Sequence, residues 1–565
     1  MFYNERVYQP SYPKGECSMR KILALVMALA FVLAACGSKA DGGGTVRIGW
    51  AGSPDSLNPG VAILTESYTI FELVYDSMYE LNLDGSFSLA AAESVERSAD
   101  GLVYTYKIHK DIKFHDGQPL TAKDIKFSYD FYGAHEDFPY MNPYTQYFET
   151  VEAPDDSTVV VTLTEAIPNI ESQLVYLYIL PEHIWKDYAE GSAATEFDNL
   201  EMIGSGPFEM VEYKQNEFVH LKANNKHFLT PPKVDEVIFQ TFESQDVLVQ
   251  AIKSGQVDMI AEMPATAVET LKGDPNVQVV SGAPFAPTVT DVIFNQVSPE
   301  NCPTDAGGIC TGHPALRDRN VRLALDHATD KQKLIDVVLL GYGTPGVTLI
   351  PDGLGMWFNS SIQGNQYDVA RANQILDDAG YKDANGDGVR DMPDGSRPLT
   401  FRLNWPSDSV DDPRVAKMLS EMWTQVGVKV EMQAVDPDAL TAQCCPAFDF
   451  DIIIWGWGSD PDPNLLLGVM TTDEIPTGSS ETGYSNPEYD ALYKQQSTEL
   501  NLQKRIELVW KMQQIAFDDA VYVIPYYPDS IQAYRTDRFT GWLTGFPKLE
   551  LTDVSSLVVI EAVKK

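Results

Sequence analysis

The stretch IIIWGWGSDPDP, residues 452–463, joins an apolar run to two tryptophans that alternate with glycine and precede an Asp-Pro repeat. The run at 452–454 is typical of a buried strand. Glycine packs no side chain into a core, and two tryptophans on a plain surface loop would be left exposed. We therefore expect the chain to leave its core here and to meet something at Trp455 and Trp457.

Outside this stretch, segments with strand and helix periodicity alternate along the chain. A capping box is predicted at Thr121, with Asp124 in place of the usual Glu. Strand–helix alternation with a few hairpins favours mixed α/β domains. The predicted strands are 46–50, 102–108, 158–163, 234–239, 257–260, 399–403 and 428–432, and the predicted helices are 68–81, 246–254, 318–328, 330–340, 369–379 and 413–425.

The composition restricts both the architecture and the partners. A chain of 565 residues is too long for one compact core, so two or three domains are expected. The formal net charge is −40, from 41 Lys and Arg against 81 Asp and Glu. Such a surface repels phosphate backbones, which excludes nucleic acid as a partner.

The N-terminal region predicts export. Arg20 and Lys21 precede an apolar run at 22–32, which is too short to span a bilayer. The small residues before Cys36 resemble the lipobox of bacterial lipoproteins, which implies a signal peptide at 19–35, a lipid on Cys36 and a flexible tether at 36–44. The alternative is an ordinary secretory peptide. Residues 1–18 contain prolines and acidic residues that suit no signal peptide, so we expect translation to start at Met19.

Export permits disulfides among the remaining four cysteines. Cys302 and Cys310 flank a short loop and are expected to pair, and a cross-link to Cys444 or Cys445 stays open. Cys444 and Cys445 are neighbours, which rarely bond to each other.

A calcium-loop spacing occurs in the second half of the chain. Oxygen ligands would come from Asp383, Asn385, Asp387, the carbonyl of Val389, Asp391 and Asp394. Position twelve is Asp394 rather than Glu, and Asn-Gly and Asp-Gly are also good turn sequences. A metal-free turn is therefore the first interpretation and a structural calcium the second. No cofactor is required by the sequence.

Signatures of catalysis are missing. The sequence has no G-x-x-x-x-G-K-[ST], H-E-x-x-H or G-x-S-x-G pattern. An exported hydrolase is therefore only a distant alternative, and we expect no enzyme.

Seven motifs, in order along the chain, resemble the peptide/nickel-type extracellular solute-binding proteins of bacterial ABC importers, called family 5. They are IHKDIKFHDGQPLTAKDIKFSYD (108–130), ILPEHIW (179–185), IGSGPFEM (203–210), AIKSGQVDMI (251–260), DRNVRLALDHATDKQKLIDVVLLGYG (318–343), WGWGSDPDP (455–463) and GYSNPEYDALY (483–493).

The resemblance implies a two-lobed, three-domain periplasmic-binding-protein-like fold with mixed sheets and a ligand cleft between the lobes. Hinge crossings are expected near 294–297 and 524–527. The implied boundaries are 45–81, 204–297 and 527–565 for the base of lobe 1, 82–203 for a domain inserted into lobe 1, and 298–526 for lobe 2.

The same resemblance implies a ligand site at residues 455–463. Peptide-binding relatives use an Asp in this region for the ligand's α-ammonium, which makes Asp460 the first candidate and Asp462 the second. Trp455, Trp457 and Gly458 would contact the ligand. Two tryptophans beside aspartates also suit an oligosaccharide, so short peptides lead and sugars stay open.

The partners that the resemblance implies are a membrane permease and its ATPase subunits. The receptor is expected to be a monomer, held by its lipid on the outer face of the cytoplasmic membrane.

Overall fold

In the computed structural model of the chain, the described residues are 44–545 and 548–564. The predictions for residues 1–18, the signal peptide, Cys36 and the tether up to residue 43 lie outside the described residues.

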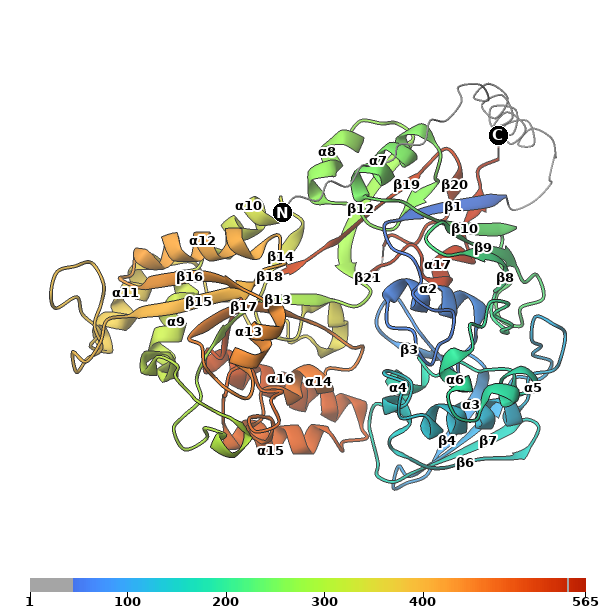
Figure 1. Cartoon of the computed structure of the whole chain (residues 1–565), viewed down its shortest axis with the longest axis horizontal. Coiled ribbons are helices and arrows are strands. Elements are labelled where there is room, and N and C mark those ends of the chain that lie inside the picture. Colours follow the sequence, from blue (N-terminus) through green and yellow to red (C-terminus); the bar gives the residue numbers. More distant parts are fainter. Residues whose placement is uncertain (1–43, 546–547, 565) are drawn as a thin grey trace, which may run out of the picture.

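Two large mixed sheets organise the molecule, one in each lobe (Figure 1). The lobe 1 sheet has eight strands in the order β21 (Lys548–Leu549), β12 (Val277–Pro284), β19 (Ser530–Arg535), β11 (Met259–Ile260), β1 (Thr45–Trp50), β10 (Glu236–Thr241), β9 (Phe218–Ala223) and β8 (Phe208–Lys214). The lobe 2 sheet has six strands in the order β14 (Gly343–Pro345), β18 (Tyr522–Pro528), β13 (Thr288–Phe294), β17 (Ile452–Gly458), β15 (Thr400–Pro406) and β16 (Lys429–Val435). Parallel and antiparallel pairs occur in both sheets, as the mixed α/β prediction requires.

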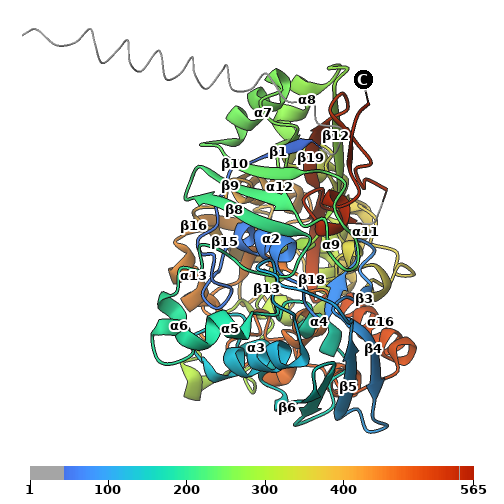
Figure 2. The same cartoon turned by 90° about the vertical axis from the view of Figure 1, so that its right-hand side faces the viewer.

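A smaller antiparallel sheet forms the inserted domain, at the opposite end of lobe 1 from the large sheet (Figure 2). Its strands run in the order β4 (Ala92–Arg97), β5 (Val103–Ile108), β7 (Thr158–Leu163) and β6 (Phe148–Asp155). Two further strand pairs are β2 (Tyr79–Leu81) with β3 (Phe87–Leu89) and β20 (Phe539–Thr540) with β22 (Glu561–Ala562).

The helices cover the sheets and fill the ends of the lobes. In the base of lobe 1 they are α2 (Thr65–Val74), α7 (Gln245–Ser254), α8 (Val268–Leu271) and α17 (Val554–Leu557). The inserted domain contains α3 (Ala122–Ala134), α4 (Ile170–Leu174), α5 (Glu182–Trp185) and α6 (Ala193–Glu196). Lobe 2 contains α9 (Arg319–His327), α10 (Lys331–Val338), α11 (Val369–Asp378), α12 (Asp412–Thr424), α13 (Pro437–Cys444), α14 (Asn464–Gly468), α15 (Pro487–Gln496) and α16 (Leu502–Asp518).

Local sequence signals explain several element ends. The predicted capping box is confirmed at the start of α3, where Thr121 and Asp124 exchange hydrogen bonds with each other's backbone. Helix α7 ends at Gly255, which has φ +75°, a value that glycine adopts without strain. The predicted helix at 68–81 is corrected: α2 ends at Val74, and the chain then forms β2 because Tyr79–Leu81 pairs with β3.

The hydrophobic cores show which parts pack as one body. One continuous cluster of buried residues joins the base of lobe 1 to the inserted domain, from Val46 on β1 to Tyr106 on β5 and Trp185 on α5. The six-stranded sheet of lobe 2 has separate clusters on its two faces. The inserted domain is therefore packed as part of lobe 1, and relative motion is expected between lobe 1 and lobe 2.

The chain crosses between the lobes at two places, and the structure corrects both predicted positions. The first crossing lies at 285–287, between β12 of lobe 1 and β13 of lobe 2, instead of 294–297. The second lies at Asp529, between β18 and β19, instead of 524–527. Residues 288–294 and 522–528 are paired strands inside the lobe 2 sheet, so they move with that lobe. Lobe 2 therefore spans about residues 288–528 rather than 298–526.

No helix in the described ranges is both long and apolar enough to cross a bilayer.

Candidate ligand-binding cleft

Strand β17 leads from the core of lobe 2 to its surface. Ile452, Ile453 and Ile454 are fully buried between the clusters on the two faces of the sheet. The next residues alternate between the half-buried Trp455 and Trp457 and the exposed glycines between and after them. The apolar run is thus a buried strand, and its continuation reaches the protein surface.

The two edges of β17 differ. One edge pairs with β13 over the whole strand, from Ile452 with Phe294 to Gly458 with Thr288. The other edge pairs with β15 only at Ile452 and Ile453. In the described parts of the chain, no strand pairs with that edge of residues 454–458. The backbone of this segment is therefore an open strand edge.

The two glycines of the segment, Gly456 and Gly458, differ in why the structure needs or tolerates glycine there. A Cβ at Gly456 would lie 2.7 Å from the carbonyl oxygen of Val289 on β13, so close strand packing requires glycine there. A Cβ at Gly458 would meet no atom within 4 Å, so this position faces open space. Of the two, Gly458 leaves room for a ligand.

A cavity of about 290 Å³ lies between lobe 2 and the inserted domain, next to the end of this segment. Lobe 2 contributes Asp460, Asp462, Asn464, Leu465, Gly468, Val469, Glu474, Ser479 and Tyr493 to its lining. The inserted domain contributes Pro143, Tyr144, Gln146, Asn169, Ser172, Gln173 and Tyr176. The structure therefore brings the predicted Asp460 and Asp462 together with residues more than 280 positions away in the sequence.

Asp460 and Asp462 have different surroundings. Asp462 is buried and forms a two-pronged ion pair with Arg505 on α16, in which Nη2 donates to Oδ1 at 2.8 Å and Nη1 donates to Oδ2. Its Oδ1 also accepts a bond from the backbone N–H of Asn464. Asp462 thus fixes the loop, while Asp460 is exposed at the cavity and forms no ion pair there with the described residues.

The pKa of Asp460 is raised above its ordinary value, first by partial desolvation in the cleft and second by the neighbouring Asp462 carboxylate. A cation arriving from solution would reverse this shift, because it favours the ionised carboxylate. Asp460 is therefore suited to pair with a positive group.

The predicted tryptophans pack partly inside lobe 2. Trp457 donates its indole N–H to Oε1 of Glu481 at 2.9 Å and packs against one apolar cluster, and Trp455 packs against another. Each keeps part of its surface exposed, so a ligand would meet their edges rather than two free faces.

Several lining residues were missed from the sequence. Tyr144 and Tyr176 stack with their ring centroids 5.5 Å apart on the inserted-domain side of the cavity. Tyr144 belongs to an aromatic-rich stretch at residues 127–148. Within that stretch Tyr129 and Tyr132 are buried in the core, whereas Tyr144 lines the cavity.

With this geometry established, comparison with known proteins decides the family. The profile of the "Bacterial extracellular solute-binding proteins, family 5 Middle" matches residues 86–474, well over half of the chain. The chain belongs to family 5 of the bacterial extracellular solute-binding proteins. The predicted family is therefore confirmed, and an extracellular family implies an exported protein.

Several relatives of this solute-binding protein match about nine-tenths of its length or more. The oligopeptide-binding protein AppA of Bacillus subtilis (strain 168) is 28% identical over 534 residues, covering 91% of this chain and 94% of AppA. The structure of AppA from Bacillus subtilis in complex with a nonapeptide has a TM-score of 0.67 and 26% identity, and covers 93% of this chain and 100% of that one. HbpA2 from Haemophilus parasuis has a TM-score of 0.77 at 21% identity, covering 92% and 100%, which supports the fold alone. These comparisons confirm the predicted fold, and the relatives are binding proteins rather than enzymes.

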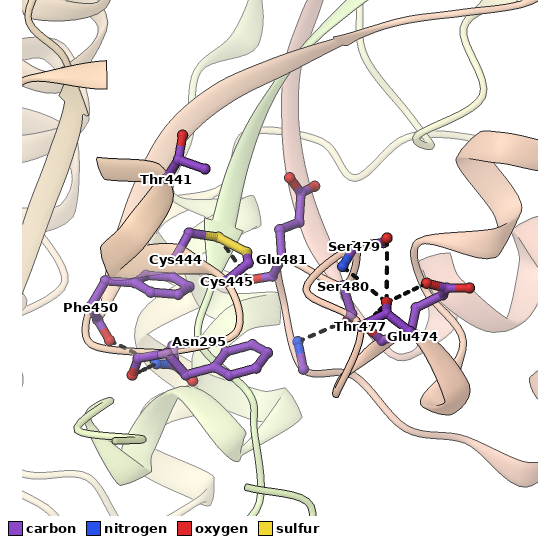
Figure 3. Close-up of a disulfide and its surroundings, with 12 residues drawn as sticks. Asn295, Thr441, Cys444, Cys445, Phe450, Glu474, Thr477, Ser479, Ser480 and Glu481 are labelled. Atoms are coloured by element: carbon purple, nitrogen blue, oxygen red, sulfur yellow. Dashed lines mark hydrogen bonds between the residues drawn. A yellow bond between two sulfur atoms is a disulfide. The ribbon is translucent and has the colours of Figure 1, made fainter. Parts of the chain in front are cut away.

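The four cysteines in the described part of this solute-binding protein form two disulfides. Cys302 pairs with Cys310, as expected from their spacing. Cys444 pairs with Cys445, which corrects the expectation that neighbours would not bond. The second disulfide lies beside the backbone carbonyl of Glu481, with Sγ of Cys444 at 4.0 Å from that oxygen (Figure 3). The disulfide therefore packs against the segment that carries Glu481.

The calcium-type loop keeps its side chains in a turn network. Asp383 accepts bonds from the backbone N–H groups of Gly386, Asp387 and Gly388. Asp391 accepts one from Ala384. Among the described residues, no group of three or more His, Cys, Asp or Glu lies close enough together to hold a metal ion. The turn interpretation accounts for these bonds, and calcium binding by Asp383, Asn385, Asp387, Val389, Asp391 and Asp394 stays a prediction.

A larger cavity of about 610 Å³ lies away from the cleft, lined by residues between Ile184 and Ile203 of lobe 1 alone. Lobe 2 contributes nothing to it, so closure of the lobes would not enclose a ligand there.

The ion pair between Asp462 and Arg505 generates a stability prediction. Asp462→Asn should lower the free energy of unfolding by about 3–5 kcal/mol, because it leaves a buried guanidinium without its counter-charge. Thermal and urea unfolding of the variant would measure this. In the Asp462→Asn variant, Arg505→Met should lower the free energy of unfolding by less than it does in the wild type, because the guanidinium is then already unpaired. A loss of less than about 1 kcal/mol in Asp462→Asn would contradict the role assigned to the pair.

We expect the free energy of unfolding to depend on pH through the buried Glu481. Burial raises the pKa of Glu481 from 4.5 to about 7, so the folded state keeps a proton that the unfolded state loses. The contribution of Glu481 therefore falls as pH rises from about 4.5 to about 7. Glu481→Gln should match the wild type near pH 4.5 and exceed its unfolding free energy by about 1–3 kcal/mol at pH 8. Unfolding curves at both pH values would test this, and an equal difference at both would contradict it.

Proposed function

We propose that this protein captures short peptides in the cleft between its lobes. The observation that carries the proposal is the open edge of β17 at residues 454–458, which ends beside the exposed Asp460 at an interlobe cavity. Two relatives are named oligopeptide-binding proteins, AppA and OppA of Bacillus subtilis, at 28% and 25% identity.

The open strand edge suits an extended peptide. A peptide that adds a strand to a sheet edge gains main-chain hydrogen bonds that do not depend on its sequence. The exposed Gly458 leaves space for such a chain, because nothing lies within 4 Å of a Cβ built there. Asp460, two residues further on, then accepts the α-ammonium of the peptide through a charge-assisted hydrogen bond.

Closure of the lobes completes the site. The cavity has walls from both lobes, and the two crossings at 285–287 and Asp529 are the positions where backbone rotation would move one lobe against the other. A ligand that contacts both walls stabilises the closed state by its differential affinity for that state. The volume of about 290 Å³ lies near the small end of the range for small-molecule pockets, about 300–1,000 Å³.

Delivery requires a membrane partner. We infer that the closed, loaded protein docks on an ABC permease with cytoplasmic ATPase subunits. A lipid on Cys36 holds the protein, as a monomer and without an enzymatic activity of its own, on the outer face of the cytoplasmic membrane. The family and the lipobox-like sequence before Cys36 support this arrangement.

Asp460→Asn tests the site. In the wild type, acetylating the N-terminus of a short alanine peptide should weaken binding by about 2–5 kcal/mol, because Asp460 loses its ammonium partner. The variant should bind the free peptide as weakly as the wild type binds the acetylated one, and acetylation should cost it little more. Isothermal titration calorimetry on the soluble form that begins after Cys36 would measure these affinities.

Asp438→Asn is a matched control, because Asp438 is an exposed acid on α13 of the same lobe. Unchanged affinity of Asp460→Asn for the free peptide would remove Asp460 from the site. Gluco-, xylo- and manno-oligosaccharides belong in the same titration. Binding of sugars alone would replace the peptide proposal by an oligosaccharide receptor.

The lipid anchor predicts a partition experiment. The wild type expressed with its own signal sequence should enter the detergent phase of Triton X-114, and Cys36→Ser should not enter it as a processed, lipidated protein, because the acyl chain needs the thiol. Intact mass of the purified proteins would show the lipid. An unmodified mature protein that begins elsewhere than at Cys36 would contradict the lipoprotein and support an ordinary secretory peptide.

A further inference from the structure

A carboxylate without partners lies in the middle of the lobe 2 sheet. Asp291 on β13 is fully buried, and neither of its side-chain oxygens has a hydrogen-bond partner in the structure. Burying such a group costs several kcal/mol, and a native fold rarely leaves one without a purpose.

Strand register shows which way Asp291 faces. Asp291 stands opposite Trp455 on β17, and directly opposed residues share a face of the sheet. Val289, two residues earlier, stands opposite Trp457. The neighbouring Val292 belongs to the core on the other face. Asp291 therefore lies on the face that carries both tryptophans of the cleft segment.

A second carboxyl lies on this face. Oε1 of Glu481 accepts hydrogen bonds from the indole N–H of Trp457 and from the hydroxyl of Tyr522, both at 2.9 Å. Tyr522 is paired with Ile293 on the strand of Asp291. The backbone carbonyl of Glu481 lies beside Cys444 (Figure 3). The backbone N–H of Gln296 donates to the carbonyl of the next residue, Thr482, at 2.7 Å.

The two carboxyls interact without a cation between them. Burial, the Glu481 carboxylate and Asp412 raise the pKa of Asp291 well above its usual value. Burial raises the pKa of Glu481 to about 7. No Lys or Arg is among the groups that shift either pKa. Burial thus favours the protonated form of both carboxyls, and a cation placed beside them would favour their ionised form.

Trp457 is placed to control access to the pair. Its indole N–H is bonded to Glu481, and part of the side chain is exposed at the cleft segment. Rotation of Trp457 would release Oε1 of Glu481 and would place the aromatic face beside an incoming cation, an arrangement that is itself favourable.

We propose that Asp291 and Glu481 form a pocket for a cationic side chain of the bound ligand, a lysine or an arginine, with Trp457 as its lid. The inference rests on the proposed peptide-binding function and deepens it, because it names a side-chain preference in addition to the backbone and α-ammonium contacts. This pocket would select among peptides, whereas Asp460 would bind the terminus that all of them share.

The test uses five pentapeptides of alanine, each with a single lysine at a different position, and two matched series with norleucine or N-ε-acetyl-lysine. Calorimetry with the soluble wild type should give one lysine position that binds at least about tenfold more tightly than both neutral analogues, the effect of one partly buried charge pair. Asp291→Asn and Glu481→Gln should each remove this preference and keep the affinity for the norleucine peptide.

Two controls make the outcomes distinct. Asp438→Asn should keep the lysine preference. The melting temperature of Asp291→Asn should not fall, since the substitution removes an unpartnered buried acid, so loss of preference would not reflect unfolding. Equal affinity for lysine and norleucine at every position, or a preference that survives in Asp291→Asn, would overturn the pocket and leave the proposed function intact. Binding of none of the peptides would overturn both.

Discussion

The pairing of β13 with β17 is the interaction on which the rest of the binding architecture depends. Strand β13 begins directly after the first crossing between the lobes, and β17 ends directly before the loop with Asp460. Because the two strands are paired over their whole length, the strand that follows the first crossing and the cleft segment belong to one sheet. The close approach of Gly456 to the Val289 carbonyl shows how tightly this pairing is packed.

The charge around the cleft depends on which acidic side chains pair with the basic residues of this acidic chain. Arg505 forms an ion pair with Asp462, and Arg402 forms ion pairs with Asp449 and Asp451, all inside lobe 2. These pairs fix loops and strand ends in place. Asp460 is exposed at the cleft, and among the described residues no cation shifts the pKa of Asp291 or Glu481. A positively charged group of the ligand would supply the counter-charge for these carboxyls.

The sequence patterns predicted the local structure well where the signal is local. The capping box at Thr121, the glycine end of α7 and the buried strand at 452–454 depend on residues within one turn or one strand. The predicted hinge positions were wrong because the apolar sequences near 290 and 524 indicate strands but do not indicate which of the two sheets each strand joins. The stretch near 290 pairs with β17, about 160 residues away along the chain, and the stretch near 524 pairs with β13, about 230 residues away. Periodicity carries no information on such pairing.

What the sequence by itself determined is the family, the mixed α/β class and the place of the cleft segment, because ordered motifs and short-range patterns suffice for these. Only the tertiary structure decided that Asp462 is bound to Arg505 while Asp460 faces a cavity, since the two residues differ by two positions and not in chemistry. The same holds for Asp291 and Glu481, which are 190 residues apart and lie on one face of one sheet. The reason is physical: burial and charge depend on which distant side chains surround a group, and only packing brings those side chains together.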